Sequence, residues 1–242
     1  MGSKVSERRF ERTLIIDADD TLWENNIFYL RCTAKFQDYM ASLGYERDQA
    51  LDMLNACERE TIPAMGYGPQ SYVASLGKAC ESLLCESGRA ADPAMIHQAQ
   101  SCGALVLDPP MILLVGVRPT LAALRPTTQL VLATKGDEVL QRRKVKRSGL
   151  GPLFDAQYML PEKNAATYQR ILSELALVPD RTWMVGNSPK SDVNPAIEAG
   201  LGAIFVPHAH TWVAEHQAIA HPEQVVTLGR FEELLAFFGM EA

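Results

Sequence analysis

Short apolar runs alternate with helical patterns over the second half of the chain. Four runs have the length and composition of buried parallel strands: 129–133, 156–160, 182–185 and 203–206. The segments between them have the periodicity of helices: 138–148, 164–176 and 194–199. Strands that alternate with helices favour a parallel sheet covered on both faces. This part of the chain is therefore expected to fold as an α/β domain of Rossmann-like topology.

A fifth apolar run, at 13–16, lies far from the other strands in the sequence. Between it and residue 109 the pattern is helical, with breaks at Gly44, around Gly66 and Gly68, and at Gly88. Four helices are predicted there: 27–43, 47–61, 70–86 and 93–107. We expect a four-helix bundle at 24–108, inserted after the first strand of a core formed by 1–23 and 109–242.

Composition and charge narrow the class of protein. The 242 residues carry a formal net charge of −6, so no broad basic field is available for nucleic acid or an anionic membrane. No apolar run approaches membrane-spanning length, and the first twelve residues do not resemble a signal peptide. Five cysteines, an odd number without a CxxC pair, indicate a reducing compartment. We expect a cytoplasmic protein; the sequence does not indicate its oligomeric state.

Polar residues follow four of the predicted strands. Asp17 and Asp19 follow the first strand, and Thr134 ends the next one. Lys163 follows the third of these strands, and Asn187 follows the fourth, with Asp192 five residues later. In open α/β sheets ligands bind at the carboxyl ends of the strands, so these side chains are expected to converge. Carboxylates, a hydroxyl and a lysine suit phosphoryl transfer, in which an acid attacks and cations neutralise the phosphoryl oxygens.

This pattern resembles the haloacid dehalogenase superfamily, and in particular its Mg²⁺-dependent phosphatases with an inserted helical cap. The four motifs of that family are present in order: Asp17-Ala18-Asp19-Asp20-Thr21, then Thr134, then Lys163, then Gly186-Asn187-Ser188-Pro189-Lys190-Ser191-Asp192. The resemblance covers nearly the whole chain from about Arg12. It implies a Rossmann-like core, a cap over the active site and a bound Mg²⁺.

The resemblance also implies a role for each residue. Asp17 would attack phosphorus and form an aspartyl-phosphate, and Asp19 would protonate the leaving oxygen and then activate water. Thr134 would bind a phosphoryl oxygen, helped by the backbone N–H of Lys135, and Lys163 would offset negative charge. An Asp17 bound to Mg²⁺ and near Lys163 should stay ionised, whereas an Asp19 that touches the metal only through its backbone carbonyl should be able to hold a proton.

One position departs from the family pattern. Many members have an acid where this chain has Asn187. An amide oxygen still binds a hard cation but contributes no negative charge. The metal ligands are therefore expected to be Asp17, the Asp19 carbonyl and the pair Asn187 and Asp192, and which member of that pair binds directly stays open.

Several residues have competing interpretations. Lys144 and Lys146 compete with Lys163 for the third motif, but they lie inside a highly charged predicted helix, so we favour Lys163. His208 and His210 lack the acid or cysteine spacing of a metal site and are interpreted as loop residues. Tyr67, in a Gly-Pro loop between two cap helices, is a candidate substrate contact, although simple packing within the bundle explains it equally well.

The sequence therefore predicts a Mg²⁺-dependent phosphatase, a hydrolase that acts on a small phosphorylated metabolite. Two other reactions occur on the same scaffold. A 2-haloacid dehalogenase has no leaving oxygen to protonate, so the presence of Asp19 argues against it, whereas a phosphomutase would keep both acids. An inactive phosphate-binding or switch protein is the alternative from another class. Such a protein would normally have lost a key residue, and only Asn187 is altered here.

Overall fold

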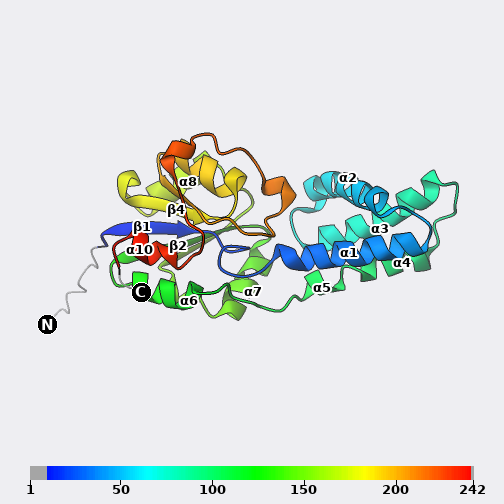
Figure 1. Cartoon of the computed structure of the whole chain (residues 1–242), viewed down its shortest axis with the longest axis horizontal. Coiled ribbons are helices and arrows are strands. Elements are labelled where there is room, and N and C mark those ends of the chain that lie inside the picture. The colour runs from blue at the N-terminus through cyan, green and yellow to red at the C-terminus, as the bar shows by residue number, and fades with distance from the viewer. Residues whose placement is uncertain (1–9, 241–242) are drawn as a thin grey trace. The chain divides into compact units, whose positions relative to one another are not determined.

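The computed structural model describes residues 10–240, which form two compact units (Figure 1). The α/β unit consists of the described residues up to Glu24 together with those from Met111 onward. The helical unit consists of Asn25–Pro110. The helical unit is therefore inserted into the α/β unit shortly after its first strand.

The α/β unit is built on a six-stranded parallel sheet with the order β3-β2-β1-β4-β5-β6. Its strands are β1 (Arg12–Ile16), β2 (Thr128–Lys135), β3 (Ala156–Leu160), β4 (Thr182–Gly186), β5 (Gly202–Phe205) and β6 (Val225–Thr227). The predicted α/β class and parallel sheet are confirmed. The short strand β6 was not predicted; it extends the sheet by pairing in parallel with β5.

The first strand lies in the middle of the sheet, between β2 and β4. The chain builds the sheet outward in one direction through β2 and β3, then returns to the other side of β1 with β4, β5 and β6. Between β1 and β4 the strand order therefore reverses. In sheets of this kind the crevice at such a reversal, outside the carboxyl ends of the strands, is where ligands bind.

Helices cover both faces of the sheet (Figure 1). On one face α6 (Val117–Leu124), α7 (Glu138–Ser148) and α10 (Glu233–Phe237) pack against strand residues such as Leu14 and Ile16. On the other face α8 (Ala165–Glu174) and α9 (Asn194–Glu198) pack against the alternate residues, such as Ile15. Alternate residues of a strand point to opposite faces, which explains why the strands are apolar throughout.

The helical unit contains α1 (Asn26–Ser42), α2 (Arg47–Met65), α3 (Pro69–Glu86), α4 (Pro93–Ser101) and α5 (Ala104–Leu107). Its core includes Phe28, Phe36, Leu54 and Leu76, all essentially inaccessible to solvent. The positions of the helices largely follow the predicted ones, with two differences. Helix α2 continues through Pro63 to Met65, and the helix predicted at 93–107 is interrupted between α4 and α5.

The interruption coincides with a close approach of the chain to α3. A β-carbon on Gly103 would lie 2.7 Å from Cγ2 of Val73 and 2.9 Å from Cδ1 of Leu76. The chain therefore comes so close to α3 that only glycine fits at this position. Helical periodicity alone does not reveal such a contact, so the prediction of one continuous helix was wrong.

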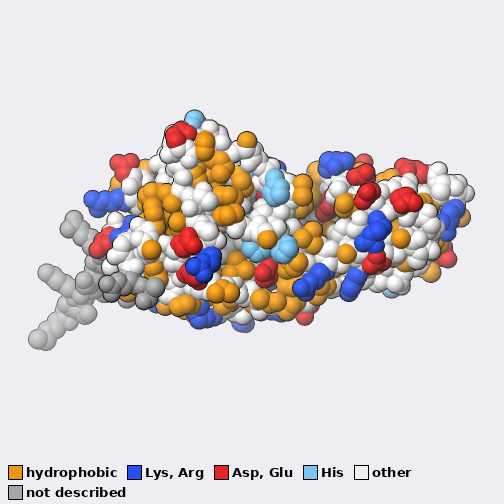
Figure 2. Space-filling view, viewed as in Figure 1, with side chains coloured by type: hydrophobic (Ala, Val, Ile, Leu, Met, Phe, Trp, Pro, Cys, Tyr) orange, Lys and Arg blue, Asp and Glu red, His pale blue; other side chains and the backbone are white. Residues whose placement is uncertain are grey.

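On the face shown in Figure 2, basic and acidic side chains are interspersed rather than gathered by sign. Among the described residues, no helix combines the length and the apolar composition that crossing a lipid bilayer requires.

Candidate active site

Asp17 is the first residue after β1, at the reversal of strand order. Its backbone N–H donates to the carbonyl of Val185 on β4 at 2.9 Å, which fixes the chain as it leaves the sheet. The side chain is buried, with only 6% of the residue exposed. Burial raises the pKa of Asp17 to about 7; the charge of Asp192 adds to this effect, and the charge of Lys163 opposes it. The positive charge of Lys163 therefore does not fully offset the cost of burying a negative charge on Asp17 next to Asp192.

Lys163 is the cation at the centre of this group. Its ammonium donates to Oδ1 of Asp17 and, at 2.6 Å, to Oδ1 of Asp192. Burial favours the neutral amine, but the charges of the two carboxylates outweigh it and raise the pKa of Lys163 well above its ordinary value. The structure thus brings together residues that lie after β1, β3 and β4, as the sequence predicts for these three.

Asp192 lies on a single π-helical turn, Pro189–Val193. Its Oδ2 accepts a hydrogen bond from the backbone N–H of Ser188 at 2.9 Å, and only 1% of the residue is exposed. The carboxylate also lies directly against Gly186, the last residue of β4. Asp192 is therefore held in one orientation, with Oδ1 facing Lys163.

Asn187 and Thr21 complete the polar lining next to Asp17. The hydroxyl of Thr21 lies 3.2 Å from Oδ2 of Asp17 and 3.2 Å from Oδ1 of Asn187. The amide nitrogen of Asn187 donates to Oγ1 of Thr211 at 2.8 Å, while its oxygen accepts from the hydroxyl of Thr21. The hydroxyl of Thr21 therefore links the amide oxygen of Asn187 to the Asp17 carboxylate.

Thr134, next to last in β2, has a buried hydroxyl with no hydrogen-bond partner among the described residues. Only 1% of the residue is exposed. A buried hydroxyl without a partner costs free energy, and such groups in native proteins call for an explanation. A ligand oxygen would satisfy it, and Thr134 ends a strand at the edge where ligands bind in this fold.

The composition of the site fits a divalent cation. Asp17 and Asp192 together carry two negative charges, and Lys163 offsets one of them. The donor set is two carboxylates and an amide oxygen, which are hard oxygen ligands of the type that Mg²⁺ prefers. A cation would also remove the repulsion between the two carboxylates that helps to raise the pKa of Asp17.

Asp19 is held differently from Asp17. Its carboxylate forms an ion pair with Lys144 at 2.7 Å and accepts hydrogen bonds from Gln141 at 2.9 Å and from the indole of Trp23 at 2.7 Å. Burial tends to raise the pKa of Asp19, but the charge and hydrogen bond of Lys144, with the other two donors, hold it below its ordinary value. These contacts therefore hold Asp19 as an ionised carboxylate, contrary to the expectation that it can hold a proton.

Lys144 makes a contact that the sequence did not predict. It lies on α7, a helix with a basic run, but its ammonium reaches Asp19, 125 positions earlier in the sequence. Gln141, one turn before it, is buried and was not singled out. The only sequence signal was their spacing of three, which places both on one face of a helix that follows Thr134.

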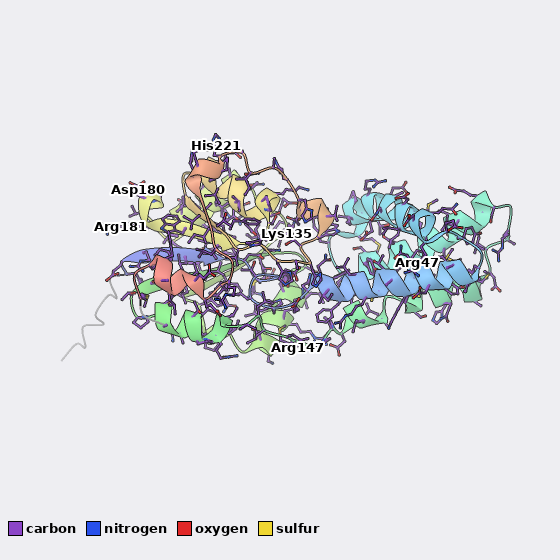
Figure 3. All side chains as sticks on the ribbon, in the orientation of Figure 1. Arg47, Lys135, Arg147, Asp180, Arg181 and His221 are labelled. Atoms are coloured by element: carbon purple, nitrogen blue, oxygen red, sulfur yellow. The ribbon has the colours of Figure 1, made fainter. Side chains whose placement is uncertain are left out.

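A second polar network lies beside the first. Lys135 lies at the end of β2 (Figure 3). It forms an ion pair with Glu215, whose carboxylate also accepts from Oγ of Ser188 at 2.6 Å. Burial tends to raise the pKa of Glu215, but Lys135 and the hydroxyl donors Ser188 and Ser191 lower it to about 2. Glu215 thereby ties the segment after β5 to the π-helical turn that carries Asp192.

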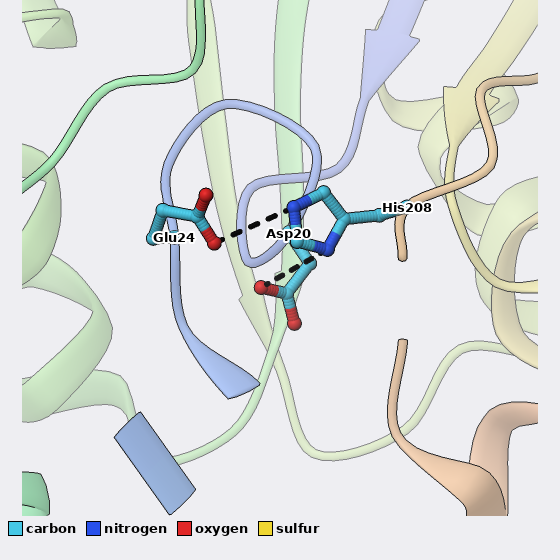
Figure 4. A group of neighbouring side chains, drawn as sticks. All are labelled: Asp20, Glu24 and His208. Atoms are coloured by element: carbon cyan, nitrogen blue, oxygen red, sulfur yellow. Dashed lines mark ion pairs between the residues drawn. The ribbon is translucent and has the colours of Figure 1, made fainter. Parts of the chain in front are cut away.

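Three further potential metal ligands, Asp20, Glu24 and His208, lie close together (Figure 4). The imidazole lies between the two carboxylates, with Nδ1 3.7 Å from Asp20 and Nε2 3.4 Å from Glu24. Because a single ion can use only one ring nitrogen, this is the geometry of a bridging side chain rather than of a chelate. Burial lowers the pKa of His208, which favours the neutral ring.

Tyr67, the candidate substrate contact, lies in the loop between α2 and α3 of the helical unit. Its assignment stays a prediction.

Comparison with known proteins identifies the family. The sequence profile of the haloacid dehalogenase-like hydrolases matches residues 11–200, which contain all four sequence motifs, from Asp17 to Asp192. The chain belongs to this family. The protein is therefore a hydrolase of the haloacid dehalogenase type, and the resemblance carried by the four motifs is confirmed.

Individual relatives agree with this family. The chain is 30% identical over 126 residues to the pyrimidine 5′-nucleotidase YjjG of Escherichia coli (strain K12); the match covers 50% of this chain and 55% of that protein. A haloacid dehalogenase-like hydrolase from Xanthomonas campestris superposes with a TM-score of 0.78 at 28% identity, covering 96% of each chain. The YfnB hydrolase of Bacillus subtilis, solved with bound magnesium, superposes with a TM-score of 0.60 at 17% identity, covering 96% of this chain and 100% of that one. This last likeness concerns the fold alone.

Proposed function

We propose that this protein is a Mg²⁺-dependent phosphomonoesterase that acts on a small phosphorylated metabolite through an aspartyl-phosphate intermediate. The observation that carries the proposal is the buried Asp17 carboxylate, paired with Lys163, together with the unsatisfied hydroxyl of Thr134 near the end of the neighbouring strand. Transfer of a phosphoryl group requires a nucleophile, a positive charge and a hydrogen-bond donor. Asp17, Lys163 and Thr134 supply these at the carboxyl ends of the strands.

The cation would be held by the Asp17 carboxylate, the Asp19 carbonyl and the side chains of Asn187 and Asp192. When bound, Mg²⁺ supplies positive charge that neutralises the phosphoryl oxygens and keeps Asp17 ionised. The amide oxygen of Asn187 shares the hydroxyl of Thr21 with the Asp17 carboxylate, which favours Asn187 as a direct ligand. Asp192 is already engaged by Lys163 and Ser188, which favours a supporting role for it.

The protein residues would divide the remaining work. One oxygen of Asp17 attacks phosphorus, while Thr134 and the backbone N–H of Lys135 bind the phosphoryl oxygens and Lys163 offsets their charge. The bond from phosphorus to the leaving oxygen breaks, and Asp19 would pass a proton to this oxygen, for which its carboxylate must first exchange the contact with Lys144 for a proton. A water molecule then attacks the aspartyl-phosphate, gives its proton to Asp19 and regenerates the free Asp17 carboxylate.

The substrate class is proposed from the chemistry and from one relative. YjjG is a pyrimidine 5′-nucleotidase, so nucleoside 5′-monophosphates are the first class to test. A hollow of about 240 Å³ in the α/β unit adjoins Asn187 and is lined also by Phe205, His208, Thr211 and His216. Its mixture of an aromatic ring and hydrogen-bonding groups suits a small polar leaving group.

The test is phosphate release from a panel of phosphate monoesters, including nucleoside monophosphates, sugar phosphates, phosphoglycolate and p-nitrophenyl phosphate. The reaction is run with Mg²⁺ or with EDTA, on the wild type and on Asp17→Asn. Release that needs Mg²⁺ and is lost in Asp17→Asn supports the proposal. Release that is equal in EDTA, or that survives in Asp17→Asn, would refute it. Chloride release from 2-chloropropionate under the same conditions would instead favour a dehalogenase.

A further inference from the structure

Glu215 belongs to none of the four motifs, yet its carboxylate joins parts of the chain that carry two of them. It ends a short 3₁₀ turn, Val213–Glu215, in the segment that follows β5. Oε2 accepts hydrogen bonds from Oγ of Ser188, at 2.6 Å, and from Oγ of Ser191. Oε1 accepts from Nζ of Lys135 at 2.5 Å. One side chain therefore holds the end of β2 and the turn after β4 together.

The two serines that Glu215 binds lie inside the fourth motif. Each serine hydroxyl is a single O–H donor, and both donate to the same carboxylate oxygen. Oγ of Ser188 also accepts from the backbone N–H of Ser191 at 2.9 Å, and the carbonyl of Ser188 accepts from the N–H of Asp192 at 2.9 Å. Glu215 thus fixes the turn that separates Asn187 from Asp192, the two side chains of this motif that are proposed for the metal site.

The other end of the contact lies directly after Thr134. Lys135 is the last residue of β2, and its backbone N–H is the donor proposed for a phosphoryl oxygen. Its ammonium also lies 3.2 Å from Oγ of Ser191 and 3.5 Å from the carboxylate of Glu162. The side chains of Lys135 and Glu215 are only 13% and 12% exposed, so their ion pair is better shielded from solvent than the surface pairs that contribute little.

We propose that Glu215, through Lys135 and the two serines, is a positioning residue that keeps the metal ligands after β4 in a fixed place relative to the phosphoryl-binding end of β2. This inference rests on the proposed phosphatase function and adds to it a role for the segment after β5. In this role Glu215 touches neither the ion nor the phosphoryl group. Loss of a residue that holds metal ligands in place typically lowers metal affinity or activity by about 10- to 100-fold.

Positioning and simple electrostatics predict opposite results at Lys135. If only charge mattered, Lys135→Met would strengthen Mg²⁺ binding, because a positive charge near the site is lost. If the contact positions the ligands, Lys135→Met should weaken Mg²⁺ binding, because Glu215 loses its link to β2. A double variant with Lys135→Met and Glu215→Ala loses one charge of each sign. Electrostatics then predicts nearly wild-type affinity, whereas positioning predicts an affinity as weak as that of either single variant.

The experiment measures Mg²⁺ binding to the full chain by isothermal titration calorimetry, without substrate. We expect the dissociation constant to rise about 10-fold in Glu215→Ala, in Lys135→Met and in the double variant alike. Lys135→Arg keeps the charge and the donors and should stay close to the wild type. The control is Glu223→Ala, because Glu223 is an exposed acid of the same segment, with a hydrogen bond to Gln224 and an ion pair to His221.

Kinetics separate positioning from a loss of folded protein. A variant that is only less stable has fewer active molecules, which lowers the apparent kcat but leaves the half-saturating Mg²⁺ concentration unchanged. Positioning requires that concentration to rise in Glu215→Ala when p-nitrophenyl phosphate is hydrolysed. Glu215→Gln keeps an oxygen that can accept from one serine but loses the ion pair. It should shift the concentration in the same direction, and it serves in place of Glu215→Ala if that variant does not fold.

Three results would overturn the inference and leave the proposed function in place. These are tighter Mg²⁺ binding in Lys135→Met, wild-type affinity in the double variant, and unchanged affinity in both Glu215→Ala and Glu215→Gln. Wild-type protein that binds no Mg²⁺ and releases no phosphate from any ester would overturn the proposed function and the positioning role together. The two failures are therefore distinguished by the wild type alone.

Discussion

Gly186 and Asp192 are in direct contact: a β-carbon on Gly186 would overlap the carboxylate of Asp192. The last residue of β4 therefore lacks a side chain because an acid of the following turn occupies that space. This close approach leaves Oδ1 of Asp192 facing Lys163 and Oδ2 bonded to the backbone of Ser188.

The substitution Gly186→Ala should push Asp192 away from Lys163. We expect overpacking to lower the free energy of unfolding by about 1 to 3 kcal/mol. The displaced acid should also lower kcat by about 100-fold. Urea denaturation and phosphatase assays measure the two effects. Gly151→Ala is the matched control, because its β-carbon would lie at an ordinary 3.4 Å from Cγ1 of Val145. Equal behaviour of the two variants would contradict the account.

Removal of the Lys163 ammonium should leave the negative charge of the site without its protein counter-charge. Lys163→Met leaves the buried carboxylates of Asp17 and Asp192 facing each other without their shared partner. Removing one partner of a buried ion pair typically costs about 3 to 5 kcal/mol, so the variant should be markedly less stable in EDTA. Mg²⁺ should raise its melting temperature more than that of the wild type. A variant as stable as the wild type in EDTA, or one that Mg²⁺ does not stabilise further, would contradict this view of the site.

Asn187 should set the affinity for the metal. Asn187→Asp adds a negative charge beside Asp17 while keeping an oxygen in nearly the same place, so the half-saturating Mg²⁺ concentration should fall. Asn187→Ala removes the oxygen and should raise that concentration. Phosphate release measured over a range of Mg²⁺ concentrations provides the values. Identical half-saturation in the wild type and Asn187→Asp would show that this position does not bind the ion.

Glu215 should make stability depend on pH in the acid range. Its pKa is lowered from 4.5 to about 2, so its contribution is complete above about pH 4.5 and is lost as the pH falls toward 2. Glu215→Gln should lower the free energy of unfolding by about 2 kcal/mol at neutral pH, and the difference from the wild type should shrink below pH 4.5. Urea denaturation between pH 7 and pH 3 tests this, with the exposed Glu198→Gln as control. A difference that stays constant over this range would exclude the ion pair with Lys135 as its cause.

Local patterns in the sequence predicted the features that depend on neighbouring residues. The apolar run before Asp17 marks the first strand, because a strand buried on both faces must be apolar throughout. Asp137 and Gly149 mark the ends of α7: Asp137 accepts from the N–H of Leu140 at 2.9 Å, and Gly149 has the left-handed φ of 65°. Convergence of Asp17, Lys163 and Asp192 followed from one rule about where parallel strands end.

Features that depend on distant contacts were missed. The contact of Lys144 was missed because its partner Asp19 is remote in the sequence, and that of Glu215 was missed because Lys135 lies 80 positions earlier. The break at Gly103 depends on Val73 of another helix, and β6 is a three-residue strand that forms because β5 offers it an edge. In each case the deciding interaction is tertiary, and the local sequence pattern does not identify the partner.

The central claim is that Asp17 carries the phosphoryl group. The most direct measurement is mass spectrometry of the peptide that contains Asp17, after acid quenching of enzyme mixed with p-nitrophenyl phosphate and Mg²⁺. Asp19→Asn should accumulate the intermediate, because p-nitrophenolate leaves without an acid while hydrolysis lacks its base. The account predicts a phosphoryl adduct on Asp17, formed together with a stoichiometric burst of p-nitrophenolate. Steady phosphate release with no adduct, and with full activity in Asp17→Asn, would contradict it.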